Sequence, residues 1–182
     1  MRLVIVASVL STSKGGYVLH MLRCLMYDQG TGDKAFRTMM QDYIQTFANQ
    51  AVSTEDFKWL VEKHMTPQMD LDGNHRMDWF FAEWVYGTDV PSYRLEYSVS
   101  SEKGGKPVVS GKLTQSGVAP SFEMRVPIYA EVEGRKILIG AMLTHGNSSG
   151  DFKAALPQQP KRILLNVNHD VLTDKEEVKR VK

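Results

Sequence analysis

The stretch FFAEWVYGTDVPSYRLEYSV, residues 80–99, decides the fold, because the spacing of its apolar side chains changes midway. Residues 80–85 have the spacing of a helix, whereas apolar and polar residues alternate over 93–99 as in a half-buried strand. Between them, Gly87 is expected to end the helix in a left-handed conformation, and Pro91 does not continue a helix. We therefore expect helices before this stretch and strands after it.

The residues before Gly87 predict an all-helical segment. Ser53 is expected to cap the third helix, with acidic residues in its first turn, and Pro67 to end it. Apolar residues at three- and four-residue spacing indicate helices over 17–28, 33–47, 53–66 and 76–86.

The residues after Pro91 predict six or seven short strands, typical of an antiparallel sandwich. Glu133-Gly134 stands between two of them and is expected to form a hairpin turn. The charged stretch 173–182 is expected to fray. The predicted fold class is α+β, with a helical segment over residues 1–88 packed against a β-sandwich domain over 89–182. The expected strands cover 93–99, 108–115, 122–128, 137–143, 152–156 and 163–167.

The composition is that of an ordinary globular protein. The chain has 182 residues, of which 42% are hydrophobic and 24% charged, with a formal net charge of +1. This balance indicates neither nucleic acid nor a membrane as a partner, and no apolar run reaches the ~18 residues of a membrane helix. The single cysteine, Cys24, cannot form an internal disulfide. Residues 1–10 favour a buried strand or an arbitrary start over a signal peptide.

Few residues have the spacing of a metal site. None of the five histidines stands in H-E-x-x-H. His20 and Cys24 share a helix face, but zinc needs three or four ligands, so a packed helical interface is favoured. Asp70, Asp72 and Asn74 resemble the start of a calcium loop, but that loop needs glycine at its sixth position and glutamate at its twelfth. His75 and Phe81 stand there, so a polar loop is favoured.

Three other segments each have a functional and a structural interpretation. Backbone amides at Lys14-Gly15-Gly16 could hold an anion before a helix, but the frame of a phosphate-binding loop is missing. Asn147-Ser148-Ser149 has the form of a glycosylation acceptor, a pattern that arises often by chance. Five aromatic residues, which we call the aromatic cluster, lie close together at helical spacing: Trp79, Phe80, Phe81, Trp84 and Tyr86. We expect this cluster to form core or an interdomain contact rather than a ligand pocket.

Several segments resemble those of one known protein family. KGGYVLHMLR, residues 14–23, is similar to the K-G-x-x-V-L-x-M-L-R run of the aminopeptidase N-type (gluzincin) zinc metallopeptidases, in which this run opens a helix shortly after the zinc site. Three further segments and a proline follow in the family's order, and the sandwich half is similar in layout. They are residues 36–43, STEDF over 53–57, FFAEWVYG over 80–87, and Pro91, with looser matches at 113–115 and 163–166.

The resemblance covers the end of the family's catalytic domain and the β-sandwich that follows. The family's zinc ligands and general base lie upstream of the lysine-glycine run, and only 13 residues precede Lys14 here. Thr12 stands where the family has a tyrosine that stabilises the oxyanion. We therefore expect no catalytic, cofactor-binding or metal-binding residue in this chain, with zinc only in a full-length relative.

Three functional hypotheses remain open. The first is a non-catalytic C-terminal fragment of such a peptidase, whose partner is the missing peptidase domain or a second copy. Met21, Met39, Met40 and the aromatic cluster would line its apolar face. The second is a stand-alone interaction module that presents loops such as 144–151 to a protein partner. The third is a small enzyme of another kind that uses His20, Cys24 and His64.

Overall fold

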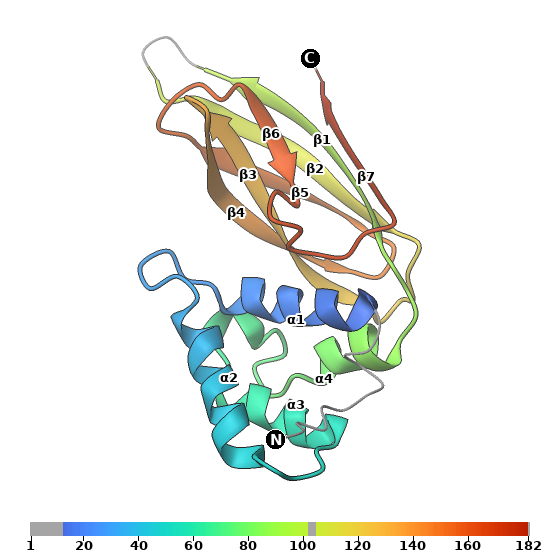
Figure 1. Ribbon diagram of the computed structural model, residues 1–182. Coiled ribbons are helices and arrows are strands. Elements are labelled where there is room, and N and C mark those ends of the chain that lie inside the picture. The colour runs from blue at the N-terminus through green and yellow to red at the C-terminus, as the bar shows by residue number, and fades with distance from the viewer. Residues whose placement is uncertain (1–12, 102–104, 182) are drawn as a thin grey trace. The chain divides into compact units, whose positions relative to one another are not determined.

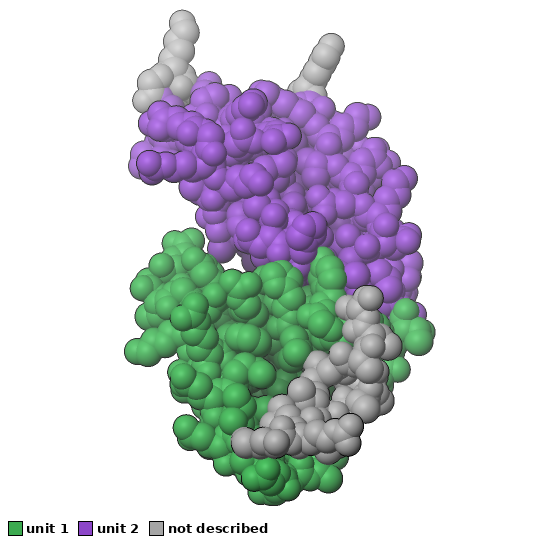
Figure 2. Space-filling model, viewed as in Figure 1, with its two compact units in different colours: residues 1–88 green, residues 89–182 purple. Residues whose placement is uncertain are grey.

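The computed structural model describes residues 13–101 and 105–181, and the chain divides into two compact units, residues 1–88 and 89–182 (Figure 2). The expectations for residues 1–10 and for Thr12 fall outside the described residues.

The first unit consists of helices joined by short turns (Figure 1). The cap predicted at Ser53 is present, because the Ser53 hydroxyl accepts the N–H of Asp56 and the Asp56 carboxylate accepts the N–H of Ser53, at 3.1 Å and 2.9 Å. The elements are α1 (Ser13–Met26), α2 (Lys34–Phe47), α3 (Thr54–Lys63), the 3₁₀-helix η1 (Pro67–Met69), α4 (Asp78–Phe80) and the π-helix η2 (Phe81–Tyr86).

The end of this unit differs from the prediction. The expected helix over 76–86 is a three-residue α-turn that widens into the π-helix η2. Gly87 is not left-handed, since its φ and ψ are −78° and 166°. A Cβ on Gly87 would lie 2.5 Å from the carbonyl oxygen of Glu83 and 2.8 Å from that of Ala82. Glycine is needed there because the chain passes close to the preceding turn.

The aromatic cluster forms the core of the first unit. Trp79, Phe80, Phe81 and Trp84 are at most 7% exposed, and the Trp79 indole N–H donates to the Met69 carbonyl at 3.1 Å. Only Tyr86 of the cluster is exposed, at 58%. Met21, Met39 and the aromatic cluster were expected to line an exposed apolar face. This expectation is wrong for Met21 and Met39, which are 0% exposed, and for the four buried members of the aromatic cluster.

The second unit contains two sheets, which together with the helical unit confirm the α+β fold class. A four-stranded sheet has the order β5-β2-β1-β7, and a three-stranded sheet has the order β4-β3-β6 (Figure 1). Every strand pair is antiparallel except β1–β7, which is parallel and corrects the fully antiparallel expectation. The strands are β1 (Ser92–Ser100), β2 (Val108–Ser116), β3 (Glu123–Val132), β4 (Arg135–His145), β5 (Ser149–Ala155), β6 (Arg162–Leu165) and β7 (Lys175–Arg180).

The parallel strand β7 lies in the charged stretch that was expected to fray. It pairs with β1 from Ser92 to Tyr97, and Val178 lies opposite Leu95. Backbone bonds hold both of its ends: Asp174 donates to the Pro91 carbonyl and Val181 to that of Tyr97. The prediction failed because edge strands carry charge as protection against pairing, so charge in such a strand does not imply disorder.

The turn between β3 and β4 is as predicted. Glu133 and Gly134 have φ of 49° and 77°, the two positive angles of the turn that suits a two-residue hairpin. A bulge interrupts the pairing of β3 with β4, so that Ile139 has no partner on β3.

A polar network lies inside the second unit. Gln115 is 1% exposed, and its side-chain oxygen accepts the hydroxyl groups of Tyr93 at 2.8 Å and Thr144 at 2.7 Å. Its amide donates to the carbonyl of Gly146 at 2.8 Å. The network ties β1, β2 and the end of β4 together without leaving the glutamine amide unsatisfied.

Candidate functional site

His20 and Cys24 lie one turn apart on α1, as their spacing requires. The sulfur and the His20 Nε2 are 3.6 Å apart, and the His20 ring meets the ring of Tyr17 edge-on at 6.1 Å. Both residues are half-buried. The pair is therefore part of a packed helix face and provides two groups, fewer than a zinc site needs.

His64 lies at the end of α3, where its Nε2 is 2.7 Å from a carboxylate oxygen of Asp42 on α2. The same oxygen accepts the Lys63 ammonium at 2.8 Å, and the other accepts the Thr46 hydroxyl at 3.1 Å. Hydrogen bonds from Lys63 and His64, the two largest causes, lower the Asp42 pKa to about 2. His64 was expected only as a candidate of the small-enzyme hypothesis, and no local pattern in the sequence indicates its ion cluster with Asp42 and Lys63.

The His64 cluster has one part of an acid–base site. A carboxylate that holds an imidazole is the orienting pair of nucleophilic hydrolases. The hydroxyl of the cluster, on Thr46, bonds the carboxylate instead of the imidazole. Within residues 13–101 and 105–181, His20 contacts Cys24 and His64 contacts Asp42, and no hydrogen bond joins the two pairs.

The polar loop before α4 closes on itself. The Asp70 carboxylate accepts the backbone N–H groups of Asn74 at 2.9 Å and His75 at 3.0 Å. In the part of the chain that the structure describes, no three His, Cys, Asp or Glu side chains are grouped so that they could hold a metal ion. The zinc implied by the family resemblance therefore does not fit these residues, and no catalytic step is assigned to them.

Lys14, the lysine of the KGGYVLHMLR segment, is bonded within the fold. Its ammonium donates to the carbonyl of Gly87 at 2.6 Å, in a partly buried position. This bond joins the first and last matched segments of the helical unit across 73 residues. The Lys14-Gly15-Gly16 segment, expected to precede a helix, lies in the first turn of α1, which begins at Ser13.

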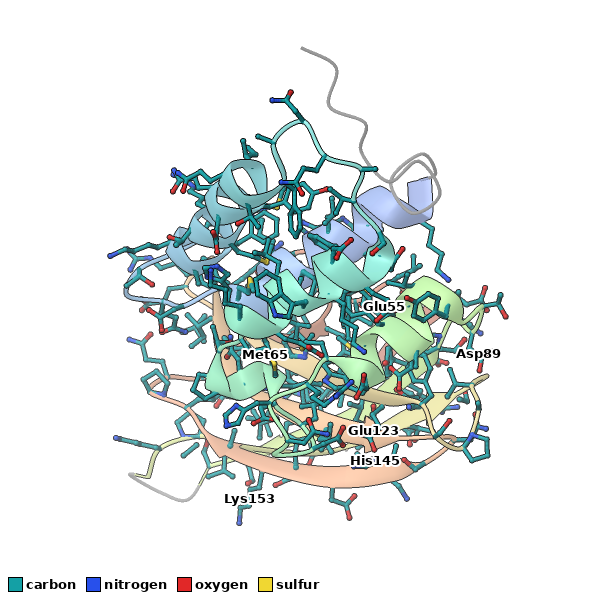
Figure 3. All side chains as sticks on the ribbon, turned by 90° about the horizontal axis from the view of Figure 1, so that it is seen from below. Glu55, Met65, Asp89, Glu123, His145 and Lys153 are labelled. Atoms are coloured by element: carbon teal, nitrogen blue, oxygen red, sulfur yellow. The ribbon has the colours of Figure 1, made fainter. Side chains whose placement is uncertain are left out.

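A second bond joins the last segment to STEDF. The exposed Tyr86 hydroxyl donates to the carboxylate of Glu55, which lies in the first turn of α3 (labelled in Figure 3). This hydrogen bond is the main reason why the Tyr86 pKa rises to about 12. We call Lys14, Glu55, Tyr86 and Gly87 the junction, because these four residues connect three of the segments on which the resemblance rests.

The loop proposed as a partner site is mostly strand. Of residues 144–151, only 146–148 form a turn, since β4 extends to His145 and β5 begins at Ser149. Asn147, the glycosylation candidate, accepts the Val118 N–H at 3.2 Å and donates to the Val118 carbonyl at 2.7 Å. His145 lies beside Glu123 of β3, 2.9 Å away (Figure 3). Asn147 therefore ties the turn to the backbone of Val118.

Among the described residues, no helix combines the length and the apolar character that crossing a bilayer requires. Comparison with family models and with curated proteins found no match. Among solved structures, the chain is similar to the crystal structure of Legionella pneumophila aminopeptidase A in complex with aspartic acid, with a TM-score of 0.58 and 12% sequence identity. The similarity covers 94% of this chain and 18% of that chain, so both units follow a fold found within a much longer protein.

Proposed function

We propose that the chain is a C-terminal portion of an aminopeptidase N-like zinc metallopeptidase, in which it supports the peptidase domain and does not itself hold the zinc. One observation carries the proposal. A helical unit and a sandwich, in this order, are similar along 94% of the chain to a segment of an aminopeptidase. The resemblance of the matched sequence segments to the aminopeptidase N-type family is a separate argument for the proposal.

The junction supports the proposal because it gives the matched segments a physical role. The Lys14–Gly87 bond fixes the start of α1 to the end of η2, and the Tyr86–Glu55 bond fixes η2 to the start of α3. The bond accounts for the lysine, which supplies the ammonium, and the close approach of the backbone at residue 87 accounts for the glycine.

The supporting role follows from where the lysine stands in such a peptidase. The family resemblance puts an oxyanion-stabilising tyrosine two residues before the position of Lys14, and this chain has Thr12 there instead. The role that we propose for Lys14 is therefore to hold the start of α1, since its ammonium donates to the Gly87 carbonyl, and not to position an oxyanion donor of this chain. The partner of the chain is then the peptidase domain itself.

The test is metal content and hydrolysis measured on the purified chain. We expect no bound zinc by mass spectrometry of the metal and no release of nitroaniline from amino-acid p-nitroanilides, with Legionella pneumophila aminopeptidase A as the positive control. One equivalent of zinc retained after dialysis, or hydrolysis above that of the buffer, would overturn the non-catalytic assignment.

A further inference from the structure

The edges of the two sheets in the second unit differ in how well they are protected against pairing with another chain. Three edges have protective features: β7 has five charged residues out of six, β6 spans four residues beginning at Arg162, and β5 exposes Asp151 and Lys153 at its middle. Charge and short length are the common means by which edge strands avoid pairing.

The fourth edge, β4, has a bulge at Ile139 but neither charge at its middle nor short length. It is the longest strand, with 11 residues, and residues 137–143 read ILIGAML, seven in succession without a charge. None of the seven is buried, and Leu138 and Leu143 are 45% and 42% exposed. Within the described residues β4 pairs only with β3, so one side of it is open (Figure 1).

The open side offers backbone groups for hydrogen bonds. In an edge strand, every second residue directs its N–H and C=O away from the sheet. Pro127 of β3 lies opposite Ala141 of β4. Because proline has no N–H to donate, these two residues fit a non-hydrogen-bonded pair of the antiparallel ladder. The backbone groups of Ala141, and by alternation those of Leu143, therefore point outward.

We propose that β4 is a self-association surface, on which a second copy of the chain pairs antiparallel with the twofold axis at Gly140. The occupant is a second copy because the strand is complementary to itself. About Gly140, the apolar residues 137–139 of one copy lie alongside the apolar residues 141–143 of the other. An isologous pairing of this kind closes at two copies and leaves no further open β4 edge.

The charges at the ends of β4 favour the same arrangement. Arg135 and Lys136 begin the strand, and its other end lies beside Glu123, the residue paired with His145. An antiparallel pair brings the basic end of one copy to the acidic end of the other at both ends of the new ladder. The bulge at Ile139 falls once in each half, so the two halves stay equivalent.

Gly140 is suited to a position on the twofold axis. A Cβ added at Gly140 has no heavy atom within 4 Å, so the centre of the pairing is open. Gly140 lies next to the outward-facing Ala141, so its own pairing across the axis makes no backbone bonds. Opposite residues of that kind have Cα atoms ~4.5 Å apart.

Sedimentation of the full chain tests the pairing. We expect reversible self-association, with a mass that rises with concentration from 20.6 kDa toward twice that value. Leu138→Lys, which places a charge in the apolar run, should weaken the dimer about tenfold. The matched control is Val181→Lys, the same change at a residue 40% exposed outside every strand, and it should leave the dimer unchanged. A wild-type chain that remains a monomer, or equal effects of the two variants, would overturn the proposal.

Disulfide trapping tests the register without altering the apolar run. In a Cys24→Ser background, Gly140→Cys should give a disulfide-linked dimer under mild oxidation, because the expected Cα separation is within the ~4.4–6.8 Å range of disulfides. Lys136→Cys is the matched control on the same strand, since it lies ~27 Å from its counterpart at ~3.4 Å per residue. Equal cross-linking at the two positions would refute an axis at Gly140.

Discussion

Replacement of Gly87 by alanine tests whether the junction depends on the close passage of the chain at this residue. The new methyl group would lie 2.5 Å and 2.8 Å from two backbone oxygens, and backbone atoms cannot move aside as a flexible side chain would. Relief of the overlap must shift η2 or Gly87, whose carbonyl accepts the Lys14 ammonium. Overpacking of this kind costs ~1–3 kcal/mol.

The matched control is Gly16→Ala. Gly16 lies within α1, and a Cβ there has no heavy atom within 4 Å apart from the excluded helix backbone. Alanine in place of a helical glycine is expected to stabilise the protein by ~0.5–1 kcal/mol. The same substitution should therefore have opposite signs at the two glycines.

Tryptophan fluorescence during urea unfolding is a suitable assay, because Trp59, Trp79 and Trp84, the three tryptophans, all lie in the first unit. With a slope of ~2 kcal/mol per molar urea, a loss of ~2 kcal/mol lowers the midpoint by about 1 M. A urea midpoint of Gly87→Ala equal to that of the wild type, or a urea midpoint of Gly16→Ala below that of the wild type, would refute the reasoning.

Four further predictions concern both units. Gln115→Ala leaves the buried Tyr93 hydroxyl and Gly146 carbonyl without this partner, and should cost about 2–4 kcal/mol of the stability of the second unit, measured by circular dichroism in urea. Ser53→Ala should cost ~1 kcal/mol by tryptophan fluorescence, because alanine cannot accept the Asp56 N–H. Glycine cannot accept it either, but glycine is a favourable N-cap residue, so Ser53→Gly should cost only a few tenths of a kcal/mol. The Asp42 pKa is lowered to about 2, so its ion cluster contributes stability above the unfolded value of ~3.9 and loses that contribution as the pH falls toward 2. Asp42→Asn should flatten the pH dependence of the urea midpoint over that window, and an unchanged slope would count against the cluster. Removal of residues 175–182 should expose the backbone amides of β1 to hydrogen exchange, and unchanged protection would show that β7 does not hold that edge.

The parts of the fold that local sequence determines were predictable. Apolar and polar residues alternate at Tyr93, Leu95 and Tyr97, and these three side chains are at most 4% exposed. The cap at Ser53 and the turn at Glu133-Gly134 were found for the same reason, because each is encoded within four residues.

The failures depend on residues far apart in the sequence. Gly87 has the spacing of a helix cap, but the carbonyl groups of the π-helix and the Lys14 ammonium determine its conformation. The partner of His64 is Asp42, 22 residues earlier on another helix, and no local pattern marks the pair. β7 was not predicted because its sequence has no alternating apolar residues, and its parallel pairing with β1 does not require them. The junction was found only as separate sequence segments, since the bonds between them arise on folding.

In the function that we propose, this sequence supports a peptidase domain in a longer protein. The most direct test is the intact mass and zinc content of the native polypeptide captured from cells with an antibody against the second unit. We expect a polypeptide far larger than 20.6 kDa that holds one zinc ion and hydrolyses amino-acid anilides. A captured protein of 20.6 kDa without zinc would contradict the claim and would leave the stand-alone interaction module as the better description.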